Sequence, residues 1–95
     1  MPDIFFRESA RLDALEAVDF LNQRKQGLGD RFSALLEIAL QQLGRLPESA
    51  REIAPGIRRA LVPTFRYRVL YTIETNRIVV IGIYHPSRSM DDFLA

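Results

Sequence analysis

Hydrophobic and polar positions follow two rhythms along the chain, and the change of rhythm predicts where helices give way to strands. A short apolar run from Ile4 to Phe6, directly before a polar turn, predicts a first strand. From about Ser9 to Arg24 the apolar residues recur at helical spacing, while polar side chains such as Asp13 and Glu16 face away from them. The apolar arc of this first helix consists of Ala10, Ala14, Leu15, Ala17, Val18 and Leu21.

A second helix follows a glycine-rich break. Gly27 and Gly29 tolerate the positive φ angles of a helix C-cap, and Asp30 is a suitable N-cap for a helix that runs to about Leu43. Pro47 then prevents the helix from continuing. Because the connection is so short, the two helices are predicted to form an antiparallel hairpin. The apolar stripe of the second helix consists of Phe32, Leu35, Leu36, Ala39, Leu40 and Leu43.

The chain after Gly56 is rich in β-branched and aromatic residues, which is typical of strands. Residues 57–62 form one candidate strand, which Pro63 ends, and residues 77–85 form another whose centre is apolar on both faces. The polar and mixed segment 48–55 is interpreted as a connection with room for a helical turn. We therefore predict an α+β fold in a single domain over residues 1–95, with an N-terminal strand, a two-helix antiparallel hairpin and then a three-stranded antiparallel meander.

Strict alternation marks the middle strand of this meander. Phe65, Tyr67, Val69, Tyr71 and Ile73 alternate with Arg66, Arg68, Leu70 and Thr72. A period of two predicts that the aromatic set faces the helices and that Arg66 and Arg68 share the outward face. Residues 74–76 are predicted to form the hairpin turn that follows.

Composition narrows the class of protein. The 95 residues include 47% hydrophobic and 26% charged residues, which suffices for one core without metals or disulfides. The absence of cysteine excludes a disulfide scaffold, a thiol nucleophile and a thiolate metal site, and it favours a reducing cytoplasm. No apolar stretch is long enough to span a bilayer, and charged residues near the N-terminus argue against a signal peptide. We expect a cytoplasmic protein that does not enter the membrane.

Charge is distributed unevenly over the two halves of the chain. Residues 1–55 carry seven Lys/Arg and nine Asp/Glu, a net charge of −2, whereas residues 56–95 carry six Arg and three acids, a net charge of +3. The candidate binding set consists of Arg58, Arg59, Arg66, Arg68 and Arg88. Arg58 and Arg59 are neighbours in a strand, so that only one of them can join the outward face. Such a face would suit RNA phosphates or an acidic protein surface, or it is simply a solvated sheet face.

A few other side chains are candidates for function. His85 is the single histidine and could serve as a general base with Arg88 as a phosphate binder, although a histidine that hydrogen-bonds the chain at a strand end is the more ordinary role. Leu12 and Phe20 lie off the apolar arc of the first helix, either as ordinary edge residues or as part of a patch that a partner covers. One histidine and no cysteine leave no expected metal site, and no phosphate-binding glycine loop or other cofactor motif is present.

The C-terminal half carries a family resemblance. The chain resembles the RelE/ParE superfamily of bacterial toxins in the sequence PTFRYRVLYTI, Pro63 to Ile73, followed by NRIVVIGIYHPSR, Asn76 to Arg88. The helical hairpin and its exit from Leu43 to Pro47 match as well, so that the resemblance covers nearly the whole chain. It implies a small antiparallel sheet with a helical hairpin packed against it.

The resemblance implies two different activities. RelE-like members cut mRNA on the ribosome with basic residues and often a C-terminal tyrosine, whereas ParE-like members poison DNA gyrase without being nucleases. The chain after Arg88 has no tyrosine, and the strand at 57–62 has arginines but no lysine, which weakens the ribonuclease interpretation. We therefore favour a ParE-like gyrase inhibitor. The alternatives are a ribosome-dependent mRNA endoribonuclease that uses His85 and Arg88, and a non-toxic interaction module.

The resemblance also implies a protein partner. Such toxins are held inactive by a cognate antitoxin, here ParD-like, whose flexible tail folds onto the toxin. Folding onto an arginine face and an apolar helix groove would explain both the arginines and the off-arc Leu12 and Phe20.

Overall fold

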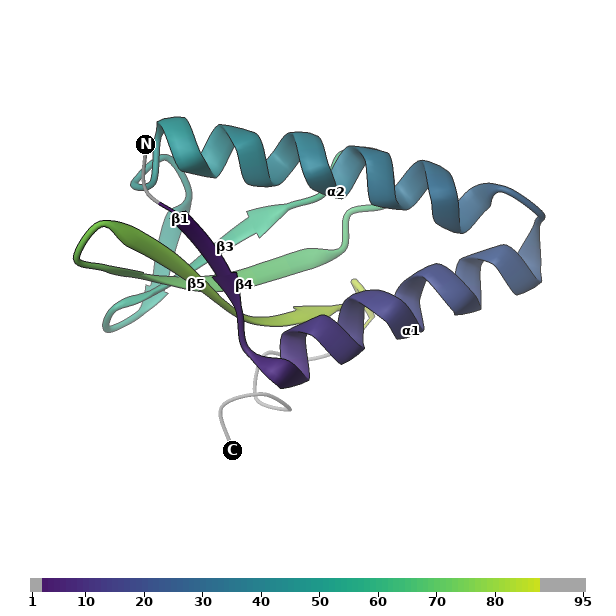
Figure 1. The fold of residues 1–95 in the computed structure, drawn as a ribbon, viewed down its shortest axis with the longest axis horizontal. Helices are drawn as coiled ribbons and strands as arrows, with labels where there is room; N and C mark the ends of the chain where they lie inside the picture. The colour runs from purple at the N-terminus through teal and green to yellow at the C-terminus, as the bar shows by residue number, and fades with distance from the viewer. Residues whose placement is uncertain (1–2, 88–95) are drawn as a thin grey trace.

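The computed structural model describes residues 3–87, which form a helical hairpin beside a five-stranded sheet (Figure 1). The elements in chain order are β1 (Asp3–Phe6), α1 (Glu8–Arg24), α2 (Leu28–Arg45), β2 (Arg51–Ala54), β3 (Ile57–Leu61), β4 (Arg68–Glu74) and β5 (Arg77–Tyr84). The order of strand, helical hairpin and antiparallel strands confirms the predicted α+β fold.

The sheet has the order β1-β5-β4-β3-β2. The N-terminal strand β1 pairs in parallel with β5, from Asp3 opposite Arg77 to Phe6 opposite Val80. All other neighbours are antiparallel. Strand β5, the last strand among the described residues, therefore lies between β1 and β4, which agrees with an interior that is apolar on both faces.

One strand was missed by the sequence interpretation. Residues 51–54, which we expected to be a connection, form the edge strand β2 and pair with β3 through Arg51 opposite Arg59. The turn between the two strands depends on Gly56, which has a φ of +75°. Its N–H donates to a carboxylate oxygen of Glu52 over 3.1 Å, so that the hairpin is closed by a side chain as well as by strand pairing.

Helix α1 approaches the sheet through small residues. Ala10, Ala17 and Leu21 are buried, whereas Leu15 is 55% exposed. The prediction that Leu15 belongs to the buried arc is wrong, because two residues turn a helix by about 200° and place Leu15 nearly opposite Ala17. Leu15 therefore lies on the outer surface of the hairpin.

The two glycines between the helices have different structural roles. Gly27, with a φ of +87°, is the N-cap of α2, so that the helix begins at Leu28 and the prediction of Asp30 as the N-cap is wrong. Gly29 lies where the two helices approach each other closely, because a Cβ atom there would be 2.2 Å from the Val18 carbonyl oxygen. The Asn22 side chain accepts the Gly29 N–H over 2.7 Å and fixes this contact.

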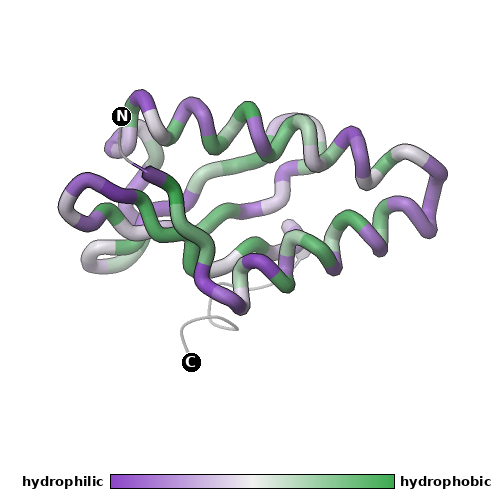
Figure 2. The backbone as a smooth tube through the Cα atoms, in the orientation of Figure 1, coloured by the Kyte–Doolittle hydropathy of each residue, from purple (hydrophilic) through white to green (hydrophobic). Residues whose placement is uncertain are grey.

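The core lies between the helical hairpin and the inner face of the sheet. Phe32 of α2 is fully buried, and its ring lies 5.6 Å from that of Phe65 and 4.9 Å from that of Tyr67. In Figure 2 the hydrophobic colour follows the middle of the strands, and the hydrophilic colour marks the connection between α1 and α2. No helix in the described part of the chain is long and apolar enough to cross a membrane.

The segment before β4 is a loop and not part of the strand. Thr64 and Arg66 have φ angles of 71° and 60°, in the left-handed region. The Val62 N–H donates to the Tyr67 carbonyl and the Arg66 N–H donates to the Val62 carbonyl, which closes a tight loop between β3 and β4. The predicted strand alternation therefore holds only from Arg68 onwards, and the prediction that Arg66 and Arg68 share one strand face is wrong.

Candidate functional site

The two adjacent arginines of β3 lie on opposite faces of the sheet. Arg58 is opposite Tyr71, a core residue, and therefore points to the helix side. Arg59 is opposite Leu70 and points to the outer face. Only Arg59 can join an outward-facing binding set, in agreement with the expectation that one of the two would.

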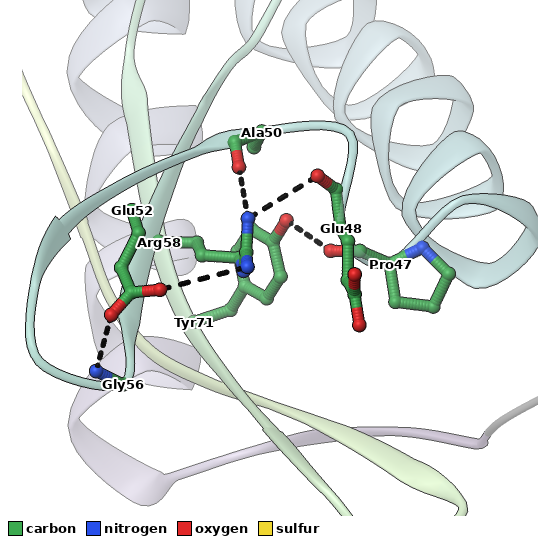
Figure 3. Close-up of polar contacts among 7 residues, drawn as sticks. All are labelled: Pro47, Glu48, Ala50, Glu52, Gly56, Arg58 and Tyr71. Atoms are coloured by element: carbon green, nitrogen blue, oxygen red, sulfur yellow. Dashed lines mark hydrogen bonds and ion pairs between the residues drawn. The ribbon is translucent and has the colours of Figure 1, made fainter.

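Arg58 is held by the chain that leads from α2 into β2 (Figure 3). One guanidinium nitrogen donates to the carbonyl oxygens of Ala50 at 2.7 Å and Glu48 at 3.2 Å. A second nitrogen lies 3.6 Å from the Glu52 carboxylate. Three guanidinium contacts to one segment give Arg58 a structural role, since they satisfy backbone carbonyls that have no sheet partner.

Tyr71 also stabilises the segment that leads from α2 into β2. Its side chain is fully buried, and its hydroxyl donates to the Pro47 carbonyl over 2.6 Å (Figure 3). Burial raises the pKa of the Tyr71 hydroxyl, and the nearby Arg58 charge acts in the opposite direction. The two side chains together fix the path from α2 to the edge of the sheet.

The outer face of the sheet carries arginines on three adjacent strands. The pairs Arg51–Arg59 and Arg59–Leu70 place Arg51 and Arg59 in one cross-strand row, and the pair Leu61–Arg68 places Arg68 in the next. Within residues 3–87 none of these three arginines forms an ion pair. We call Arg51, Arg59 and Arg68 the outer arginine row.

Sequence reasoning missed one member of this row and misplaced another candidate. Arg51 lies in the segment interpreted as a connection, although the Pro55-Gly56 dipeptide between two short apolar stretches is a hairpin signal. Arg66 lies in the loop, where its carbonyl accepts a 3.0 Å hydrogen bond from the Arg68 guanidinium. Arg88 lies outside the described residues.

Apolar side chains accompany the arginines on the outer face. Leu61 lies beside Arg68 and is exposed, and Phe5 of β1 is exposed at the far side of the sheet. The guanidinium of Arg77 lies 4.9 Å from the centre of the Phe5 ring and is also paired with Glu74 at 2.8 Å. Glu74 thus neutralises the positive charge of Arg77. The unpaired positive charge of the outer face is concentrated on the outer arginine row.

His85 follows β5 and is exposed. Its Nδ1 accepts the Ser87 N–H at 3.0 Å and lies 2.7 Å from the Ser87 hydroxyl. Because an acceptor nitrogen carries no proton, the proton of the neutral ring is on Nε2. The ring also packs edge-to-face on Tyr67, with the centroids 5.3 Å apart.

Leu12 and Phe20 are exposed, at 50% and 44%, which agrees with their place off the buried arc of α1. They do not contribute equally to one site. Phe20 lines a groove of 410 Å³ between α1 and the end of β5, and Leu12 does not.

The groove also contains residues that the sequence did not single out as functional. Asp13 was predicted to face solvent, but its carboxylate accepts the Ile83 N–H over 3.0 Å and forms part of the groove wall. Glu16 and Tyr67 line the groove as well, together with His85, which the sequence did single out. These residues come from distant parts of the chain, and no local pattern in the sequence links them.

No group of three or more histidine, aspartate or glutamate side chains between residues 3 and 87 could hold a metal ion.

Comparison with solved structures places this fold among toxin–antitoxin proteins. The chromosomal ParDE TA system from P. aeruginosa is similar with a TM-score of 0.67 and 13% identity, over 90% of this chain and 96% of that chain. The intact E. coli RelBE toxin–antitoxin complex is similar with a TM-score of 0.64 and 19% identity, over 93% of this chain and 100% of that chain. A comparison with curated protein sequences gave no match.

A family model, described as the ParE toxin of the type II toxin–antitoxin system parDE, matches residues 4–90. This match spans the helical hairpin, the sheet and the groove. The chain therefore belongs to the ParE toxin family of type II toxin–antitoxin systems, within the RelE/ParE superfamily.

Proposed function

We propose that this toxin inhibits growth in the bacterial cytoplasm by binding and poisoning DNA gyrase, and that it does not cut RNA. Membership of the ParE family supports the gyrase target. The arrangement around His85 supports a binding mechanism, because its Nδ1 lone pair is occupied by the Ser87 N–H and its other nitrogen carries the proton. A neutral His85 in this state has no free lone pair with which to take a proton from a ribose hydroxyl.

The contact surface we propose for the target is the outer arginine row. Arg51, Arg59 and Arg68 carry positive charge on one face and have no acidic partner among residues 3–87. Arginine binds carboxylates through two parallel hydrogen bonds, which suits an acidic protein surface. Exposed Leu61 adds an apolar contact beside Arg68.

We further propose that a ParD-like antitoxin neutralises the toxin. Both similar structures are described as toxin–antitoxin assemblies, which supports a partner of this kind. The antitoxin would cover exposed apolar residues of α1, among them Leu12 and Phe20, and would compete with the target for the outer face.

Supercoiling by purified gyrase tests the proposal. The purified chain should block supercoiling of relaxed plasmid and leave mRNA intact in a ribosomal translation mixture. The double variant Arg59→Glu, Arg68→Glu should need about tenfold more protein for the same inhibition, a change of about 1.4 kcal/mol. Arg31→Glu on the exposed surface of α2 is the matched control and should inhibit like the unmodified chain.

Two results would replace the proposal. Cleavage of ribosome-bound mRNA that disappears with His85→Ala would make the protein a ribonuclease. Normal growth of cells that produce the chain without any antitoxin would make it a non-toxic interaction module.

A further inference from the structure

We propose that the groove between α1 and the end of β5 binds one cationic side chain, an arginine or a lysine, presented by a peptide segment of the antitoxin. The identity of the partner rests on the proposed function. The chemistry of the recognised side chain rests on the groove itself, which has two carboxylates, an unbonded hydroxyl and an exposed aromatic ring.

The carboxylates come from α1. Asp13 and Glu16 are three residues apart, so they lie on one side of the helix, and both line the groove. Asp13 uses one oxygen to accept the Ile83 N–H, which fixes its orientation and leaves its second oxygen available. Neither carboxylate is paired with a cation in the part of the chain that the structure describes. A groove with two unneutralised carboxylates attracts positive charge.

Tyr67 provides a second and independent indication of a ligand. Only 6% of the residue is exposed, and it lines the groove. The hydroxyl makes no hydrogen bond within residues 3–87, yet no side-chain oxygen or nitrogen there is both fully buried and unbonded. The hydroxyl of this nearly buried residue therefore keeps some accessible surface, and we assign that surface to the groove that Tyr67 lines.

The surroundings of Tyr67 indicate what its hydroxyl would bind. Burial raises the pKa of the hydroxyl, which remains neutral and keeps its proton, and the charge of Arg24 acts in the opposite direction. A protonated hydroxyl beside a positive charge is a good donor, so we assign it to a carbonyl oxygen of the bound peptide.

The arginine at the end of α1 does not line the groove. Arg24 lies eight residues beyond Glu16, which is about 12 Å along the helix, and it is placed over the Phe20 ring at 5.5 Å. It therefore does not neutralise the carboxylates. The exposed Phe20 ring lines the groove and can pack against the methylene groups of a long side chain. This order of groups favours a peptide over a nucleic acid, because the carboxylates would repel phosphates.

Titration of the isotope-labelled full chain, made by cell-free synthesis, tests the inference by NMR. The probe is N-acetyl-arginine amide, and the reporters are the backbone amides of Ile83 and Ser87. The neutral isostere N-acetyl-citrulline amide should bind about fivefold more weakly, because it lacks the charge. Equal shifts with both probes would overturn the inference, and so would tighter binding of a nucleoside monophosphate at the same amides.

Variants locate the binding site. Glu16→Gln should weaken binding of the arginine probe about fivefold, and Tyr67→Phe about threefold through loss of one hydrogen bond. Glu37→Gln changes an exposed carboxylate on α2 and is the matched control, with unchanged binding expected. Thermal unfolding of each variant verifies that the fold is retained. Unchanged binding in Glu16→Gln would refute the site.

This test is separate from the toxin assay. A chain that blocks gyrase but does not bind the arginine probe leaves the proposed function intact and removes the groove inference. A chain that binds the probe in the groove but does not block gyrase supports the groove inference and contradicts the proposed function.

Discussion

The two faces of β3 use the same residue type for opposite purposes. Arg58, on the helix side, makes its contacts within the protein, to the carbonyls of Glu48 and Ala50 and to Glu52. Arg59, on the outer side, has no ion pair among the described residues and stands beside Arg51. Neighbouring residues of a strand point to opposite faces of the sheet. In β3 this alternation places an arginine that stabilises the fold on one face and an arginine that is available for a partner on the other.

Two regions of the molecular surface also differ in the sign of their charge. The outer face gathers unpaired arginines from β2, β3 and β4, whereas the groove beside α1 gathers unpaired carboxylates. The described part of the chain therefore has surfaces of opposite charge. A partner that covers both must itself carry acidic and basic segments.

The largest effect on stability is expected from a substitution on the helix side of the sheet. Tyr71→Ala removes a fully buried ring together with its bond to Pro47, and it should lower the free energy of unfolding by about 3–5 kcal/mol. Urea denaturation measures this change. A loss below about 1 kcal/mol would mean that the segment after α2 does not depend on Tyr71.

Arg58→Ala should have the next largest effect, a loss of about 2 kcal/mol. The variant leaves the Ala50 and Glu48 carbonyls without their donor and breaks the Glu52 pair. Hydrogen exchange should show faster opening of β2 and the preceding loop, with little change in α1. Equal protection in the variant and the unmodified chain would contradict the structural role of Arg58.

High pH should lower the free energy of unfolding through Tyr71, on the helix side of the sheet. Burial raises the pKa of Tyr71 above its ordinary value of 10.0. The stability contributed by the neutral hydroxyl is complete below the unfolded pKa of about 10 and is lost as the pH rises through the raised folded value. Unfolding free energies measured at increasing pH should fall less steeply in Tyr71→Phe than in the unmodified chain. Identical slopes would exclude Tyr71 as the cause.

The smallest effect on stability is expected on the outer face. Arg59→Ala should change the free energy of unfolding by less than about 0.5 kcal/mol, because the side chain has no partner to lose. Its effect should appear instead in partner binding, which calorimetry with the antitoxin would measure. A stability loss as large as that of Arg58→Ala would erase the distinction between the two faces.

Parts of the fold followed directly from sequence patterns. The strand, helical hairpin and antiparallel strands were predictable because their periods of 3.6 and 2 are local properties. The loop at 62–67 was not, since its residues continue the alternation and only hydrogen bonds between Val62, Arg66 and Tyr67 reveal the turn. Strand β2 was hidden because it is only four residues long, two of them charged, and lies at the sheet edge.

The candidate sites were predictable to a smaller extent. The sequence indicated a basic outward face, and Arg59 and Arg68 do lie on it, but it could not distinguish Arg58 from Arg59. It singled out Phe20 and His85 but could not show that they share a groove, since contacts such as the Asp13 carboxylate with the Ile83 N–H join residues 70 positions apart.

The sequence by itself determined the order and type of the elements, the position of the charge and the family to which the chain belongs. Only the tertiary structure decided which arginine is held inside the fold, and that Tyr67 and Glu16 share a groove. The physical reason is the range of the interactions. Periodicity arises between neighbours along the chain, whereas a side chain acquires its partners only when distant segments pack together.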